Sequence, residues 1–306
     1  MQRYQVVSVR TALLAIVLFL MIFVSACGAG PTPEATNVSE PTLEATADGQ
    51  AAEPEFADFD PGNFDNPTVI DNEWMPMQPG TEWVYEGTAV DDDGKSVDRR
   101  IEFIVTDLTK EIAGVRTVVG WIVDYTDGEL VEKEIAFYAQ DNDGNVWYLG
   151  EYPEDYENGE FVEAPAWITG IEDAKAGIKL MAEPQLGAPN VYQGWGPAVE
   201  WSDFGHVEQM GQKTCVPVDC YEDVLVNAES SLGEEGAFQL KYYARGVGEV
   251  RVGWTGPDET KEELELVEHV QLSAEDLVQV RADVLEVEKH AYEVSKDVYA
   301  KTSPAE

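Results

Sequence analysis

Positively charged residues are scarce in this chain of 306 residues, which contains 19 lysines and arginines against 60 aspartates and glutamates. The formal net charge at pH 7 is −41. A protein with this balance is repelled by nucleic-acid phosphates and by anionic lipid head groups. We therefore expect no nucleic-acid partner and no direct binding to an acidic membrane surface.

Cysteine is equally rare, with only Cys27, Cys215 and Cys220. The last two lack the additional cysteine or histidine ligands that a zinc site needs, and their spacing does not match a Cys-x-x-Cys redox motif. They flank a four-residue segment between two strand-like runs. We predict that they form a disulfide closing a short loop, which indicates an oxidising compartment, with free thiols as the alternative.

The sequence contains no catalytic motif, neither a Gly-x-Ser-x-Gly turn nor a glycine-rich phosphate-binding loop. The three histidines are isolated from one another. Acidic residues are so abundant that no pair of carboxylates identifies glycoside chemistry. We predict a non-enzymatic binding or interaction module without a cofactor. The alternatives are a structural or assembly protein and a hydrolase that uses carboxylates.

Residues 66–271 show the period-two alternation of β-strands, as in Arg100–Val105, interrupted by turns such as Asp127-Gly128 and Asp143-Gly144. Strand-like runs separated by Asp-Gly predict hairpins. We expect a mainly β fold, a curved antiparallel meander that forms an open barrel or a clam-like sheet. The segment 153–197 is irregular and rich in glycine and proline. It is expected to plug one end of the sheet, or else to form a binding lid.

The periodicity changes in residues 272–301, which predict one amphipathic C-terminal helix. Ser273 is a suitable N-cap, with Asp276 three residues later. Apolar residues from Leu277 to Val298 then recur at alternating spacings of three and four. This stripe either docks on the chain's own sheet or pairs with another helix in a homo-oligomer.

Tryptophan is the most promising residue type for ligand binding, because aromatic rings line apolar pockets and sugar-binding platforms. Trp167, Trp195 and Trp201 lie in or beside the irregular segment and are the candidate ligand-binding residues. The expected partner is a small apolar molecule, a glycan or an envelope protein.

A single stretch of the sequence suggests a metal site. Asp141, Asp143 and Asn145 offer oxygen ligands around a glycine turn, a pattern that suits Ca²⁺. The alternative is a hairpin turn in which these side chains bond to the backbone.

The N-terminal region has no apolar run of the roughly 20 residues that a membrane-spanning helix needs. Arg3 and Arg10 are followed by uncharged residues and then by Val24-Ser25-Ala26-Cys27. This resembles a bacterial lipoprotein signal peptide. The resemblance implies cleavage before Cys27 and lipid on its sulfur. Residues 1–26 would be the signal, and residues 27–65, rich in proline, threonine, alanine and acids, a disordered tether.

Several phrases resemble a family of uncharacterised bacterial exported proteins and lipoproteins with an antiparallel β domain. They are Tyr138–Asp141, Gly144–Glu151, Gly170–Pro184 and Lys241–Gly248, and the resemblance extends from about Asn66 to Val270. It implies the β fold and a location on the extracytoplasmic side of a membrane, but no activity. The chain departs from the family at Arg245, where a proline is expected, and in its cysteine pair and C-terminal helix.

Overall fold

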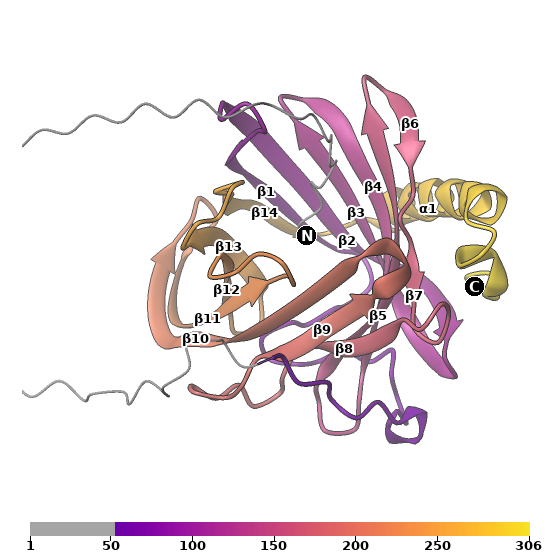
Figure 1. Ribbon diagram of the computed structural model, residues 1–306, viewed down its shortest axis with the longest axis horizontal. Coiled ribbons are helices and arrows are strands. Elements are labelled where there is room, and N and C mark those ends of the chain that lie inside the picture. The colour runs from indigo at the N-terminus through magenta and orange to yellow at the C-terminus, as the bar shows by residue number, and fades with distance from the viewer. Residues whose placement is uncertain (1–52) are drawn as a thin grey trace, which may run out of the picture. The chain divides into compact units, whose positions relative to one another are not determined.

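The computed structural model describes residues 53–306, so Cys27 and the signal peptide lie outside the described residues. Within these residues, fourteen antiparallel strands form one sheet, and twelve of them close into a barrel (Figure 1). The predicted mainly β fold with one C-terminal helix is confirmed. The strands are β1 (Thr81–Val90), β2 (Ser96–Ile112), β3 (Val115–Thr126), β4 (Glu129–Gln140), β5 (Val146–Glu157), β6 (Glu160–Glu163), β7 (Trp167–Ile168), β8 (Lys175–Leu180), β9 (Val191–Gly196), β10 (Trp201–Cys215), β11 (Cys220–Ser230), β12 (Phe238–Ala244), β13 (Gly248–Thr255) and β14 (Glu263–Gln271).

The barrel is a meander whose ring is completed where β14 pairs with β1. Strand β5 pairs with β4 along one edge. Along its other edge, its first residues pair with β8, its middle with β7 and its last residues with β6. The barrel wall is therefore continuous. The sequence had predicted an open barrel or a clam-like sheet.

The expected irregular segment 153–197 instead contains the end of β5 and the strands β6 to β9. Two of these strands, β8 and β9, belong to the barrel wall. Neither a plug nor a lid describes the segment. Its strands are short and separated by glycine and proline, so their pairing depends on the distant edges of β5 and β10, which local sequence does not show.

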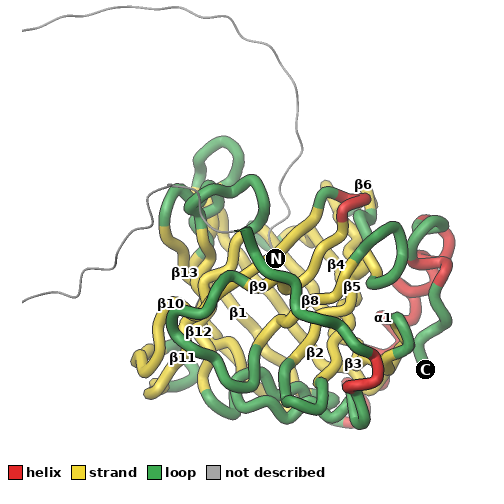
Figure 2. The backbone as a smooth tube through the Cα atoms, turned by 60° about the horizontal axis from the view of Figure 1, so that its bottom comes forward, coloured by secondary structure: helices red, strands yellow, loops and turns green. Residues whose placement is uncertain are grey.

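The helix α1 (Ala274–Val294) packs on the outer face of the sheet, against β2 and β4 (Figure 2). Its buried residues Val284, Val287 and Ala291 join the outer-face core together with Phe137 and Leu149. The Ser273 hydroxyl accepts a hydrogen bond from the Asp276 N–H, as the N-cap pattern predicts. The helical stripe thus docks on the chain's own sheet, one of the two alternatives. None of the helices in residues 53–306 is long and apolar enough to cross a membrane.

The packed part of the chain begins before the predicted boundary at residue 66. The Glu55 N–H donates to Asn190, and the Phe56 ring stacks on Tyr192 at 4.0 Å between centroids. Phe59 contacts the edge of Trp147. These aromatic residues pack residues 55–64 against the outside of the barrel. The sequence did not predict this packing, because the surrounding segment is mostly polar.

Candidate functional site

Aromatic rings cover one side of the barrel interior, hereafter the aromatic wall. Neighbouring rings along this wall have centroids 4.6–6.2 Å apart, within the range of favourable aromatic contact. The rings come from six strands, β1, β2, β4, β5, β7 and β10. They belong to Trp83, Phe103, Tyr138, Tyr148, Trp167 and Trp201.

Two of the three predicted ligand-binding tryptophans meet in this wall. Trp167 and Trp201 stack at 4.6 Å with an interplanar angle of 22°. Glycines on β9 make room for them, because a Cβ at Gly194 or Gly196 would lie 2.6 or 2.5 Å from Trp167 atoms. Trp195 points to the opposite face of β9, where it contacts Phe56 and Lys175.

The indole N–H of Trp167 makes no hydrogen bond within the described residues. The Trp167 side chain is 2% exposed. A buried N–H without an acceptor is unfavourable by about 1–3 kcal/mol. An oxygen-bearing ligand would remove this penalty.

A second part of the interior is polar, hereafter the charged wall, and is centred on Glu229 of β11. Lys179 of β8 donates to Glu229 Oε2 at 2.9 Å, and Gln193 of β9 donates to Oε1 at 2.8 Å. Asn227 also donates to Oε1, at 3.2 Å. Burial alone would raise the pKa of Glu229, but the ammonium groups of Lys179 and Lys241 and the Gln193 hydrogen bond lower it to about 2.

Two further acids complete this wall. Glu249 of β13 lies 4.0 Å from the Lys241 ammonium group, so Lys241 pairs within the chain. Asp203 of β10 accepts a hydrogen bond from Ser231 at 3.0 Å. Burial, followed by repulsion from Glu229 and Glu151, raises the pKa of Asp203 to about 6 against the opposing effect of Lys179.

The aromatic and charged walls adjoin, because β10, which carries Trp201, lies between β9 and β11 of the charged wall. Burial raises the pKa of Tyr138 well above its usual value, and the carboxylates of Glu134, Glu151 and Glu229 add to the rise. The Tyr148 hydroxyl hydrogen-bonds both Glu134 and Glu151, each 2% exposed. The phenols of Tyr138 and Tyr148 therefore stay protonated at neutral pH beside buried carboxylates.

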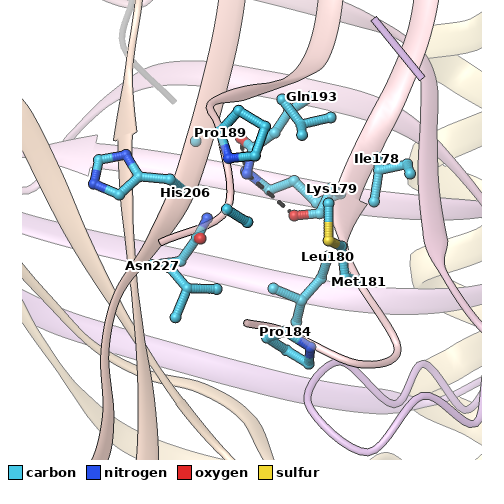
Figure 3. Close-up of a pocket in the computed structure, with 13 residues that line it drawn as sticks. Ile178, Lys179, Leu180, Met181, Pro184, Pro189, Gln193, His206 and Asn227 are labelled. Carbon is cyan, nitrogen blue, oxygen red and sulfur yellow. Dashed lines mark hydrogen bonds between the residues drawn. The ribbon is translucent and has the colours of Figure 1, made fainter. Parts of the chain in front are cut away.

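A small pocket opens where β8 and β9 separate, and Figure 3 shows its lining. These strands pair only through Lys175–Trp195 and Ala176–Gly194. Beyond those pairs the Gln193 side chain bridges the gap, donating to the Lys179 carbonyl at 3.1 Å and accepting from the Lys179 ammonium group at 3.1 Å. The barrel wall is thus held here by side chains.

The pocket at this seam brings the charged wall to the protein surface. Its lining includes Lys179, Gln193 and Asn227 together with apolar residues of β8 and the following loop. A volume of about 30 Å³ is open to the centre of a water-sized sphere, enough for one or two waters. The seam pocket alone is too small for an organic ligand.

The predicted calcium ligands form the alternative structure, a hairpin turn. Asp141 accepts the backbone N–H groups of Asp143 and Asn145 and the Trp147 indole N–H, while Asp143 accepts from Asn63. No group of three or more acidic, histidine or cysteine side chains within residues 53–306 is arranged to hold a metal ion. Ca²⁺ binding stays a prediction without geometric support.

The predicted disulfide between Cys215 and Cys220 is present at the tip of the β10–β11 hairpin. Its short loop places Val216, 8% exposed, in the interior core cluster. The disulfide therefore stabilises one margin of the barrel and is not part of the charged wall.

The charged wall itself was not predicted. Acids are too abundant in the sequence for any one to stand out. A signal did exist in β11, where Asn227 and Glu229 follow the apolar residues 224–226 two positions apart, which places both on one buried face.

Comparison with known proteins provides no identification. No protein-family model matches this chain, and neither does any curated protein or any solved structure.

Proposed function

We propose that this protein is a membrane-anchored extracytoplasmic lipoprotein whose barrel binds a small ligand in its interior. The binding role rests on one observation, the inward-facing combination of six aromatic rings and a charged wall. Apolar side chains would stabilise a purely structural core more than charged ones, since buried charges rarely contribute net stability.

Three features support an interior that admits a ligand. Phe103 and Asp203 face inward yet are only half-buried. Trp167 presents an unsatisfied N–H donor. At the seam between β8 and β9 the wall depends on the Lys179 and Gln193 side chains, which can separate without breaking a backbone ladder.

Binding can be tested by titrating the protein with the neutral dye N-phenyl-1-naphthylamine and recording dye fluorescence excited through tryptophan. We expect saturation at one site. Trp167→Phe should raise the Kd about 3- to 10-fold, since it removes stacking area and the N–H donor. The matched control Trp195→Phe, on the outer face, should leave the Kd unchanged. Unsaturable binding, or equal effects of the two variants, would argue against an interior site.

The anchor is proposed from the lipobox at Val24–Cys27. In a bacterial host, Cys27→Ser should move the protein from the membrane fraction to the soluble extracytoplasmic fraction or leave its signal uncleaved, because no sulfur remains to carry lipid. Immunoblots of fractionated cells measure the change, with Cys215→Ser as the matched control that should stay membrane-bound. Unchanged membrane association of mature, cleaved Cys27→Ser would refute the anchor.

A further inference from the structure

The edge of β9 that faces β8 is covered, beyond their short ladder, by residues from the beginning of the described chain. Glu55 lies against Val191 in a parallel bridge. Its N–H donates to the Asn190 carbonyl at 2.8 Å, and its carbonyl accepts from the Tyr192 N–H at 3.0 Å. Because Val191 also pairs with Gly205 of β10, Glu55 occupies the other edge of β9, the one that β8 uses further along. Glu55 therefore completes the barrel wall where β8 and β9 separate.

Residues 55–57, hereafter the strap, are held by few polar contacts. The two hydrogen bonds of Glu55 are the backbone bonds that join the strap to the rest of residues 53–306. The Phe56 ring stacks on Tyr192 and lies 4.3 Å from the Lys175 ammonium group, yet Phe56 is 40% exposed. A segment with so few hydrogen bonds and buried contacts opens at a lower free-energy cost than the strand ladders around it.

The strap covers the part of the wall beside the seam pocket. Val191, its bridge partner, lines that pocket, as do Lys179, Gln193 and Asn227 of the charged wall (Figure 3). Gln193 directly follows Tyr192, whose backbone and ring both contact the strap. If the strap separated from β9, the side-chain bonds between Gln193 and Lys179 alone would join β8 to β9 here.

We propose that the strap is a releasable closure of the seam, and that its separation from β9 gives solvent and ligand a path through the pocket to the charged wall. This inference concerns the regulation of the proposed binding site and rests on that proposed function. Separation breaks no ladder of the barrel, and water can bond the Asn190 and Tyr192 backbone groups that it frees. The following residues stay attached, because Phe59 packs against Trp147 of β5.

Two variants loosen the strap in different ways. Phe56→Ala removes the ring that stacks on Tyr192, and Glu55→Pro removes the N–H that donates to Asn190. Hydrogen exchange of the full chain at neutral pH, followed by mass spectrometry, measures opening of residues 190–194. We expect exchange there to become about tenfold faster in both variants. Exchange in β3 should keep its wild-type rate, which would show that the barrel as a whole remains folded.

Entry of a ligand is measured by stopped-flow mixing with the naphthylamine dye. A closure is passed in both directions, so loosening it should raise the rate constants for association and dissociation together, about threefold. The Kd should change less than twofold, because neither variant alters the interior site and a change that favours bound and free states equally shifts no equilibrium.

Phe161→Ala is the matched control, because Phe161 is 37% exposed and lies on β6, where it contacts His290 of α1. It should leave the exchange of residues 190–194 and the dye kinetics unchanged. Equal effects of Phe161→Ala and Phe56→Ala on exchange would overturn the inference. Faster exchange with unchanged dye kinetics would also overturn it, since the dye would enter by another route while the binding function stands. If the dye binds no variant, the proposed binding function fails, and the exchange rates alone decide whether the strap closes the seam.

Discussion

Replacing Lys110 with alanine should lower the free energy of unfolding by about 3–5 kcal/mol, the loss expected when one partner of a buried ion pair is removed. Lys110 is fully buried between β2 and the C-terminal segment. Its ammonium group donates to Glu288 of α1 at 2.8 Å, to the Tyr292 hydroxyl at 3.1 Å and to the Ser303 carbonyl. It also lies 4.4 Å from the centre of the Tyr299 ring.

The variant would leave the Glu288 carboxylate, 5% exposed, without its cation. Glu288 also accepts hydrogen bonds from the Tyr299 hydroxyl and the Ala305 N–H, so the disturbance should extend through the C-terminal residues. The segment after α1, which pairs with β2 through Glu306 and Thr109, should detach from the sheet.

Urea unfolding followed by circular dichroism measures the loss of stability, and hydrogen exchange of residues 299–306 locates it. Lys301→Ala is the matched control, because Lys301 pairs with Glu172 at the surface, where both side chains are about half exposed. Such a pair contributes less than about 1 kcal/mol. If Lys110→Ala were no more destabilising than Lys301→Ala, the buried cluster would not be what holds the C-terminal segment.

The fold could be predicted from sequence wherever the signal is local. Alternating residues and Asp-Gly turns define β2 to β5, and the Ser273 cap and apolar stripe define α1. The closure of the barrel could not be predicted, because it depends on the pairing of β1 with β14 and of β5 with β8. The identity of these partners is decided by register over long sequence separations, as in Val146 opposite Leu180.

The sequence predicted the aromatic part of the candidate site but not its charged part. Tryptophan is rare enough to be singled out, and Trp167 and Trp201 do meet inside the barrel. Their separation from Trp195 depends on the parity of β9, where Gly194 and Gly196 face inward and Trp195 outward. Glu229 and Asp203 were hidden among 60 acids, because burial, which distinguishes them, is a property of the closed barrel.

Glu229→Gln should lower the free energy of unfolding at pH 7 by about 3 kcal/mol. Glu229 is the shared counter-ion of two interior ammonium groups, and its side chain is 5% exposed. Glutamine keeps the size and one acceptor oxygen but removes the charge that pairs with the Lys179 ammonium group at 2.9 Å. Asp203 and Glu249 act on Lys179 only from a longer distance, so the loss of its direct buried partner outweighs the retained hydrogen bonds.

The pH dependence of this effect follows from the lowered pKa. Glu229 titrates near pH 2 in the folded protein, against 4.5 for an ordinary glutamate. Its contribution to stability is therefore complete above about pH 4.5 and is lost as the pH falls toward 2. A difference of this size corresponds to about 3 kcal/mol. The difference in unfolding free energy between the wild-type protein and Glu229→Gln should thus be largest at neutral pH. It should shrink as the pH falls from 4.5 to 2.

Urea unfolding at several pH values between 2.5 and 8 tests both the size and the shape of this effect. Glu222→Gln is the matched control, because Glu222 pairs with Lys213 at the surface and both side chains are more than 70% exposed. It should change stability by less than about 1 kcal/mol at every pH. A Glu229→Gln deficit that persisted unchanged at pH 2.5 would show that lost packing, and not charge, is responsible. The charged wall would then hold its lysines by some means other than the charge of Glu229.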